Sequence, residues 1–248
     1  MSLIEFKKNV YSQNGEDGII QEIINRLNLF EKNNLWCCEF GAWDGKHSSN
    51  TFALVEKYNF NAVYIESDKH KFKNLLKTAE KFPAIIPINL KVEKHKSNNN
   101  SLDNILSKTK ITKDFEILSI DIDSYDLDVW ESLEDYNPKM VIIEINSSIP
   151  PGILQKHGFK TQGNSFSSAL VTAKNNGYKL VCHTGNCIFI RKDLINLLKI
   201  DQKFFDNPEL LFQKDWLYKK DSLFKKTLTK MIPNFLLPYL RIIKKILN

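Results

Sequence analysis

"CCEFGAWDGKHSSNT", residues 37–51, is the stretch that decides the fold. Its first part is apolar enough for a buried strand, and the chain then breaks into a turn between Gly41 and Gly45. A glycine turn at the end of a strand is typical of an open α/β sheet that binds a nucleotide there. Glu39 precedes the turn and Asp44 lies within it. Their carboxylates would repel the phosphates of a dinucleotide, so the turn indicates a ligand of a different charge.

Strand-like runs around this stretch predict the fold class. The early runs are almost continuously apolar, as expected of parallel strands that are covered on both faces. Helical patterns separate them, which favours right-handed βαβ units in a doubly wound sheet. The last two runs are joined by only Thr184 and Gly185, and so short a link forces an antiparallel hairpin. The seven runs span residues 35–41, 61–66, 84–90, 115–121, 139–146, 178–183 and 186–192.

This order of elements predicts an α/β fold of the class I S-adenosylmethionine (SAM) methyltransferase type. Such a fold is a Rossmann-like, doubly wound sheet, mainly parallel, with a C-terminal antiparallel hairpin. A dinucleotide-binding Rossmann domain usually ends in parallel strands instead. Asn14 is expected to cap the first helix. Helices are predicted near residues 14–27, 49–58, 69–81, 101–108, 126–135 and 166–176.

The formal net charge of +6 is concentrated at the carboxyl end of the chain. Residues 214–248 hold nine basic and two acidic residues, whereas the remainder holds 26 basic and 27 acidic residues. A near-neutral body offers no broad surface for phosphates, so the sequence indicates no clear nucleic-acid partner. We therefore divide the chain into a predicted methyltransferase domain, residues 1–205, and a basic amphipathic helical tail, residues 206–248.

The cysteines and the apolar runs indicate a cytoplasmic protein. Cys37 and Cys38 are adjacent and cannot easily pair, and neither they nor Cys182 and Cys187 show a metal-binding spacing, so we interpret all four as reduced core residues. The amino-terminal residues lack the apolar core of a signal peptide. No run approaches the ~20 apolar residues of a membrane span.

The cofactor that fits an acidic glycine turn is SAM, which carries a sulfonium and an ammonium group and no phosphate. Glu66 ends the second strand-like run, where an acid typically receives the two ribose hydroxyls. The alternative is structural: Glu39 would be a charge at a strand end, and Glu66 a helix cap. Trp43 either lines the cofactor pocket or simply packs. The residues predicted to bind the cofactor here are Glu39, Gly41, Ala42, Asp44, Gly45 and Glu66.

Several motifs together resemble the FkbM-type SAM-dependent methyltransferases over about residues 11–193. The resemblance implies a class I methyltransferase fold and O-methylation, often of sugars or polyketide-like hydroxyls. One departure is Ser124, which stands where the family usually has glycine. The motifs are "YSQNGEDGII" (11–20), "EFGAWDGKHSSNT" (39–51), "VYIESD" (63–68), "LSIDIDSYDLDVW" (118–130), "MVIIEIN" (140–146), "GYKLV" (177–181) and "GNCIFIRKD" (185–193).

Acids at the end of the fourth strand are the candidates for chemistry. Asp121 and Asp123 lie two residues apart and so project to the same side, where they and Glu144 are the predicted catalytic acids, and Asp121 could also hold the cofactor. Alternatively, with Glu144 or Asn146 of the next strand, they could hold a divalent cation such as Mg²⁺ or Mn²⁺. A third possibility is that these acids cap the following helix, which is the interpretation we favour for Asp126.

Two further groups of polar residues are ambiguous. Gln13, Glu16 and Asp17 precede the first strand, and this segment folds over the cofactor in many methyltransferases. Equally, acids at a helix start are stabilised by the helix dipole. His183 ends the sixth strand-like run and could be the base of the acceptor pocket, although a lone histidine at a hairpin is more often ordinary surface.

The function that the sequence predicts is SAM-dependent O-methylation of a sugar, glycan or small-molecule hydroxyl. The alternative is a non-catalytic SAM-fold module that recruits a partner or a membrane through the tail. An NAD-dependent enzyme is less consistent with the missing GxGxxG motif. After Pro238 the tail can form a short basic amphipathic helix, which would contact an anionic membrane peripherally, pack on the domain or form a homo-oligomer.

Overall fold

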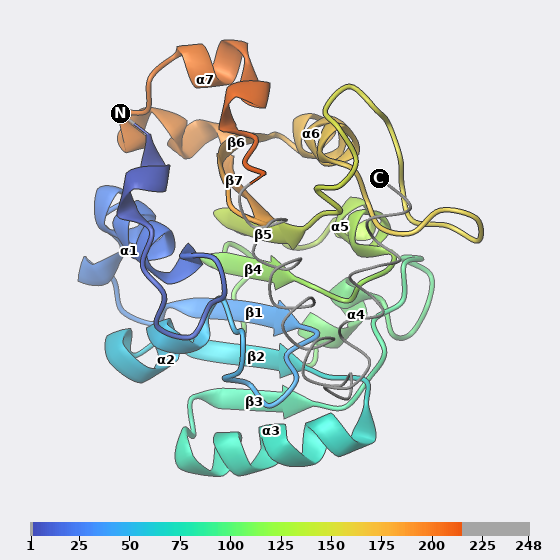
Figure 1. Ribbon diagram of the computed structural model, residues 1–248. Coiled ribbons are helices and arrows are strands. Elements are labelled where there is room, and N and C mark those ends of the chain that lie inside the picture. Colours follow the sequence, from blue (N-terminus) through green and yellow to red (C-terminus); the bar gives the residue numbers. More distant parts are fainter. Residues whose placement is uncertain (1, 215–248) are drawn as a thin grey trace, which may run out of the picture. The chain divides into compact units, whose positions relative to one another are not determined.

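The structure, a computed structural model, describes residues 2–214. Its centre is a seven-stranded sheet in the order β3-β2-β1-β4-β5-β7-β6 (Figure 1). β1 to β5 pair in parallel, and β7 runs antiparallel to both β5 and β6. The predicted class, a mainly parallel α/β sheet with a C-terminal antiparallel hairpin, is confirmed. The strands are β1 (Trp36–Phe40), β2 (Asn61–Ile65), β3 (Ile85–Ile88), β4 (Ile117–Ile120), β5 (Met140–Glu144), β6 (Tyr178–His183) and β7 (Asn186–Arg191).

Helices cover both faces of the sheet, as the alternation of strands and helices requires. One face packs against α1 (Glu16–Arg26), α2 (Phe52–Tyr58) and α3 (Lys69–Lys81). The opposite face packs against α4 (Leu102–Leu106), α5 (Asp126–Ser132) and α6 (Phe166–Asn175). The remaining helical segments are η1 (Leu3–Phe6), η2 (Leu29–Glu31), η3 (Lys192–Leu198), α7 (Lys203–Asp206) and η4 (Pro208–Leu211).

The start of α1 differs from the prediction, because the N-cap position is Gly15 and not Asn14. Gly15 has φ of 96°, a left-handed conformation in which its backbone turns the chain into the helix. No side chain caps this end. Asn14 instead donates its backbone N–H to Glu16 Oε2 at 2.8 Å. The helix pattern located α1, but the residue at which the helix begins depends on a backbone conformation that only glycine adopts easily.

β1 is buried along its whole length, and its side chains alternate between the two cores. Trp36, Cys38 and Phe40 belong to the core under α4, α5 and α6, whereas Cys37 belongs to the core under α1 and α2. Glu39 therefore projects from the same side of the sheet as Cys37. All four cysteines of the chain are buried and unbridged.

The described chain continues past residue 205, and its last residues still pack on the domain. Phe212 stacks on the ring of His183 with 5.0 Å between the ring centroids, and Gln213 donates its backbone N–H to that ring. The predicted amphipathic helix after Pro238 lies outside the described residues, and so do its predicted membrane and oligomer contacts. Within residues 2–214, none of the helices is both long and apolar enough to cross a membrane.

Trp130 provides a test of the core under α5. Its side chain is 1% exposed and packs against Tyr178 and Phe189, with ring centroids 5.4 and 5.3 Å apart. We expect Trp130→Ala to lower the free energy of unfolding by about 3–5 kcal/mol, because it leaves a large cavity. The matched control is Trp43→Ala, which removes a half-exposed tryptophan and should cost about 0.5 kcal/mol or less. Urea denaturation measures both, and equal losses would contradict this account of the core.

Candidate functional site

A pocket lies beyond the carboxyl ends of β1, β2, β3 and β4. Its lining includes Phe40 and Gly41 after β1, Ser67 after β2, and Ile122 and Tyr125 after β4. It has a volume of about 160 Å³. The strand order reverses between β1 and β4, and ligands of open α/β sheets bind at such a switch point. The pocket is therefore the candidate ligand site.

Gly41 allows the loop after β1 to pass against the end of β4. Its φ is 78°, and a Cβ atom added to it would lie 1.7 Å from the carbonyl oxygen of Asp121. No other residue type fits this position without moving the backbone of one of the two strands. The prediction that Gly41 belongs to the ligand site agrees with its position in the pocket wall.

The backbone amides of the glycine loop are already used within the protein. Gly41 and Ala42 both donate their N–H groups to the carbonyl oxygen of Ile65. Trp43 donates to Glu66 Oε2 at 2.9 Å, and Gly45 donates to the carbonyl oxygen of Ala42. The next two amides, of Lys46 and His47, donate to Asp44 Oδ1. A phosphate needs such amides as donors, so this loop is not built to bind a pyrophosphate.

Glu66 is buried and fastens two loops at the pocket. Its Oε2 accepts from the amide of Trp43, and its Oε1 accepts from the amide of Asp68 at 2.7 Å. Each carboxylate oxygen can accept a second hydrogen bond, so contact with a ribose is not excluded by these bonds. The predicted contact of Glu66 with the ribose stays a prediction. The structure shows in addition that Glu66 holds the loops after β1 and β2 together.

Glu39 is buried beneath the start of α2. Its Oε2 accepts from the hydroxyls of Ser49 and Thr51, at 2.9 and 2.6 Å, and from the amide of Thr51 at 3.1 Å. Burial raises the pKa of Glu39 to about 7, although these hydrogen bonds favour the charged form. The geometry matches the structural alternative for Glu39, in which its carboxylate holds the chain that leads into α2.

Asp44 and Trp43 occupy the outer part of the loop. Asp44 closes its own turn through the amides of Lys46 and His47. Trp43 is 43% exposed, and the Lys71 ammonium lies 4.9 Å from the centroid of its ring. Trp43 neither lines the pocket nor belongs to the core, so neither of the two roles expected for it describes its position.

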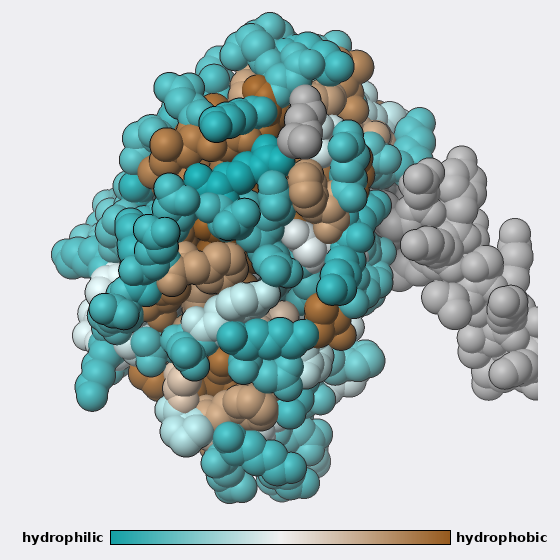
Figure 2. Space-filling model, turned by 90° about the vertical axis from the view of Figure 1, so that its left-hand side faces the viewer, coloured by the Kyte–Doolittle hydropathy of each residue, from teal (hydrophilic) through white to brown (hydrophobic). Residues whose placement is uncertain are grey.

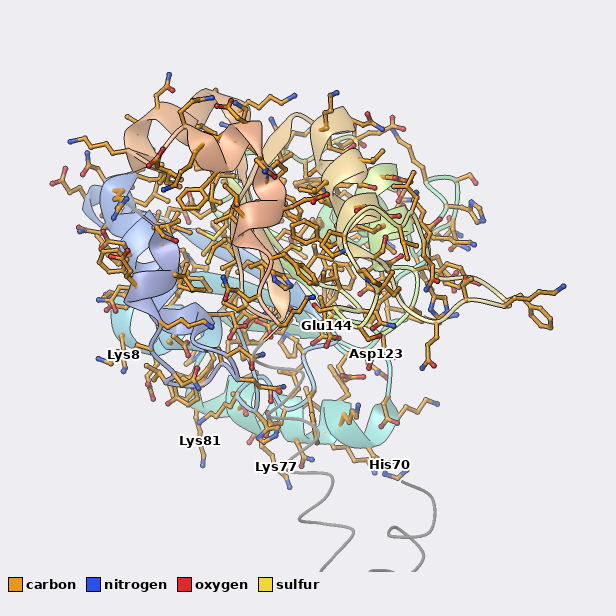
Figure 3. The ribbon with its side chains drawn as sticks, turned by 45° about the horizontal axis from the view of Figure 1, so that its top comes forward. Lys8, His70, Lys77, Lys81, Asp123 and Glu144 are labelled. Carbon is orange, nitrogen blue, oxygen red and sulfur yellow. The ribbon has the colours of Figure 1, made fainter. Side chains whose placement is uncertain are left out.

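Three carboxylates gather at the ends of β4 and β5. One oxygen from each of Asp121, Asp123 and Glu144 lies within 4.8 Å of the others, and the three side chains are at least partly exposed. Figure 3 shows Asp123 and Glu144 close together at this edge. Asp123 has φ of 56°, a left-handed conformation that aspartate tolerates. The turn next to Ser124, which stands where the family usually has glycine, therefore has its left-handed residue at Asp123. Asp121 and Asp123 do project to one side, as predicted.

Asn146 and Asp126 are used by their own loops. The Oδ1 atom of Asn146 accepts from the amide and the hydroxyl of Ser148, at 3.1 and 2.5 Å. Asp126 is buried, and its two oxygens accept from the amides of Ile122 and Ser124. Asp126 therefore closes the turn before α5, and the favoured interpretation that it caps this helix is wrong, because the N-cap residue is Tyr125 and no side chain caps that end. The predicted metal site at Asp121 and Asp123 remains a prediction, with Glu144 the acid that lies beside them.

Glu16 and Asp17 are both buried and hold the amino-terminal segment in place. Glu16 Oε1 accepts from the Thr184 hydroxyl at 2.5 Å and from Asn186 Nδ2 at 3.2 Å, which joins α1 to the β6–β7 hairpin. Asp17 Oδ2 accepts from three consecutive amides, those of residues 10–12, and from the Ser12 hydroxyl. Both acids do lie in the first turn of α1, where the dipole alternative placed them, and these contacts add a structural role that was not expected. Gln13 is exposed.

His183 does not have the geometry of a base that faces an acceptor. Its side chain is fully buried, its Nε2 lies 3.1 Å from the Ser147 hydroxyl, and its Nδ1 accepts from the amide of Gln213 at 2.9 Å. Burial lowers the pKa of His183 to about 3. The predicted catalytic role therefore has no support, because both ring nitrogens are engaged inside the protein. The alternative, that His183 is an ordinary surface residue, is wrong because its side chain is fully buried.

The loop after β3 is the part of the pocket that the sequence did not reveal. Residues 90–94 line it, and the Lys94 ammonium lies 3.8 Å from the centroid of the Tyr125 ring. This cation–π contact closes one side of the pocket. Lys94 belongs to none of the quoted motifs, and the motif that contains Tyr125 does not reveal their contact, since it joins two loops that are about 30 residues apart in the chain.

The strand order, the terminal hairpin and the pocket at the switch point define a class I methyltransferase fold. Neither the family models nor the curated proteins give a match to the chain. Among solved structures, M. capricolum TrmK in complex with S-adenosyl-homocysteine is 18% identical, over 89% of this chain and 93% of that one, with a TM-score of 0.44.

Two further solved structures are similar to a comparable degree. The CMeT domain of the citrinin polyketide synthase is 10% identical over 73% of this chain and 54% of that one, with a TM-score of 0.48. A SAM-dependent methyltransferase from Aquifex aeolicus is 11% identical over 71% and 92%, with a TM-score of 0.39. Such distant likenesses concern the fold alone, and the fold assignment rests on the strand order of this chain.

Glu39 makes the stability of the protein depend on pH. The folded protein keeps a proton on Glu39 up to about pH 7, whereas an unfolded chain releases it near ~4.3. This contribution to stability is complete below about pH 4 and is lost as the pH rises through 7. Relative to Glu39→Gln, the wild type should therefore lose roughly 2–3 kcal/mol between pH 5 and pH 8. Urea denaturation at both pH values measures this difference, and parallel pH profiles for the two proteins would refute it.

Gly41→Ala tests the close approach of the loop to β4. The added Cβ would collide with the Asp121 carbonyl, so we expect a loss of more than about 3 kcal/mol in unfolding free energy. Gly152→Ala is the matched control, because Gly152 also has a positive φ, 92°, but nothing lies within 4 Å of an added Cβ. The control should lose only about 1–2 kcal/mol. Similar losses in thermal melting would show that the contact with β4 is unimportant.

Proposed function

We propose that the protein is a SAM-dependent methyltransferase that methylates a hydroxyl group of a sugar, a glycan or a small-molecule acceptor. The observation that carries this proposal is that the backbone amides of the glycine loop already donate hydrogen bonds within the protein. Its amides from Gly41 to Ala42 and from Gly45 to His47 are engaged within the protein, and Trp43 donates to Glu66. A nucleotide bound at this switch point therefore has to do without a pyrophosphate, and SAM meets that condition.

The pocket and the acid cluster are formed by different residues of the loop after β4, so the cofactor and the acceptor would have neighbouring places. Ile122 and Ser124 line the pocket, whereas Asp121 and Asp123 gather with Glu144. The adenosine of SAM would lie in the pocket, beside Ser67. The three carboxylates provide a negative potential that attracts a sulfonium and an ammonium group.

The acids also offer a route for the proton of the acceptor. When bound, SAM supplies an electrophilic methyl group, whose transfer breaks a C–S bond and forms a C–O bond. A carboxylate of Asp121 or Asp123 would hold the acceptor hydroxyl by a hydrogen bond and take its proton. Gly41 and Glu66 fix the loop beside these acids, so the acceptor would be positioned against a rigid wall. A hydroxyl acceptor, whose proton has to leave, accounts for exposed carboxylates at this edge.

Calorimetry and a methyl-transfer assay on the full chain test this proposal. We expect SAM to bind and NADH not to bind, because six amides of the loop already donate within the protein and are not available to a pyrophosphate. Asp121→Asn should keep SAM binding and lose about 10²–10⁴-fold in transfer of labelled methyl to a panel of saccharides and hydroxylated small molecules. Asp135→Asn removes an exposed acid outside the site and is the matched control. The same transfer assay with and without a chelator tests the predicted dependence on Mg²⁺ or Mn²⁺.

Different failures would point to different alternatives. Tight NADH binding would contradict the class of cofactor. A folded protein that does not bind SAM would favour the non-catalytic module. Methyl transfer to RNA but to none of the hydroxyl acceptors would overturn the acceptor class. Full transfer activity in Asp121→Asn would remove this residue from the chemistry.

A further inference from the structure

The outer face of α3 carries a row of lysines that neither the fold nor the pocket uses. Lys69, Lys73, Lys77 and Lys81 follow one another at intervals of four residues, and all four are exposed. Positions four apart lie on one side of a helix, about 6 Å apart along its axis. In Figure 3, Lys77 and Lys81 project outward from α3, away from Asp123 and Glu144.

No ion pair among the described residues gives these lysines a role in stabilising the fold. Among residues 2–214, none of the four forms an ion pair with a carboxylate. Like charges at i and i+4 destabilise a helix, and the row contains three such pairs. Lys69 also lies in the first turn, where the helix dipole disfavours positive charge. Lys81 in the last turn is favoured by the dipole, but the repulsion within the row and the position of Lys69 are not offset by any ion pair among the described residues.

Exposed apolar side chains accompany the row. Leu76 is 41% exposed on α3, and Trp43 is 43% exposed beside the first turn, in contact with Lys71. Tryptophan is enriched where a membrane meets water, because its ring is apolar and its N–H is polar. α3 lies at the β3 edge of the sheet, at the bottom of Figure 1. Hydrophilic residues dominate the corresponding lower end of Figure 2.

We propose that the outer face of α3, with Trp43 at its end, rests on an anionic membrane surface. Each lysine is turned by about 40° around the helix axis from the one before it, so Lys73 and Lys77 lie in the middle of the face and the long side chains of Lys69 and Lys81 reach a flat layer of headgroups from either end. It contains lysine and no arginine, and lysine is a point charge without the planar fork that reads individual phosphates. Each lysine near an anionic bilayer contributes about fivefold to binding. This surface is independent of the basic tail and of the proposed function.

If the proposed function holds, the same contact would explain how an acceptor reaches the site. Ser67 lines the pocket and Lys69 begins the row two residues later. A membrane on the outer face of α3 would therefore lie beside the rim of the pocket. A glycan linked to a lipid would be presented there without leaving the membrane.

Co-sedimentation of the full chain with vesicles of phosphatidylglycerol and phosphatidylcholine tests the membrane contact. Lys73→Gln/Lys77→Gln should bind about 30-fold more weakly than the wild type, since two lysines are lost. The matched control is Lys108→Gln/Lys110→Gln, which removes the same charge from exposed residues that precede β4. The control should bind within about twofold of the wild type. The basic tail is unchanged in all three proteins, so its contribution to vesicle binding does not affect the comparison. Circular dichroism confirms that each variant is folded.

Three outcomes would overturn the proposal. The first is equal weakening in both double variants, which would show a response to net charge alone. The second is unchanged vesicle binding by Lys73→Gln/Lys77→Gln. The third is binding of single-stranded RNA, but not of vesicles, that is lost in this variant and kept in the control, which would assign the row to nucleic acid. A larger loss of binding between 0.1 M and 0.5 M salt in the wild type and the control than in Lys73→Gln/Lys77→Gln would support it.

Discussion

The close approach of Gly41 to the Asp121 carbonyl is the contact on which the candidate site depends. It joins the loop after β1 to the end of β4, the two strands between which the sheet order reverses. A side chain at residue 41 would push these strands apart. With the glycine in place, the loop turns back toward β2, donates two amides to Ile65 and is fastened by Glu66. The pocket wall is therefore fixed before any ligand arrives.

The acids singled out in the sequence include two groups with different physical roles. Glu16, Asp17, Glu39, Glu66 and Asp126 are buried, and each accepts hydrogen bonds from backbone amides or hydroxyls of the protein. Burying a carboxylate is costly, so these donors are needed to hold it. Asp121, Asp123 and Glu144 lie at the edge of the sheet instead. This second group is at least partly exposed, and it is the group to which the proposed function assigns the acceptor.

Charge is thus separated over the surface of a domain that is nearly neutral in total. The carboxylates gather at the ends of β4 and β5, and lysines line the outer face of α3 at the β3 edge. Fields of opposite sign at neighbouring edges can act on two different partners at once. Such an arrangement would place a cationic cofactor and an anionic surface at separate parts of the same end of the protein.

The sequence by itself determined the elements that depend on local pattern. Apolar runs located all seven strands, the two-residue link at Thr184 required the hairpin, and the glycine turn marked the switch point, since each signal acts between residues that are close in the chain. Asp121 and Asp123 projected to one side for the same reason. The roles of the buried acids depended on tertiary structure. Glu16 meets Thr184 across 168 residues, and Lys94 meets Tyr125 across two loops, so no local pattern could show these partners. Folding also buried His183, because residues near 213 close over a ring that the sequence left open to solvent.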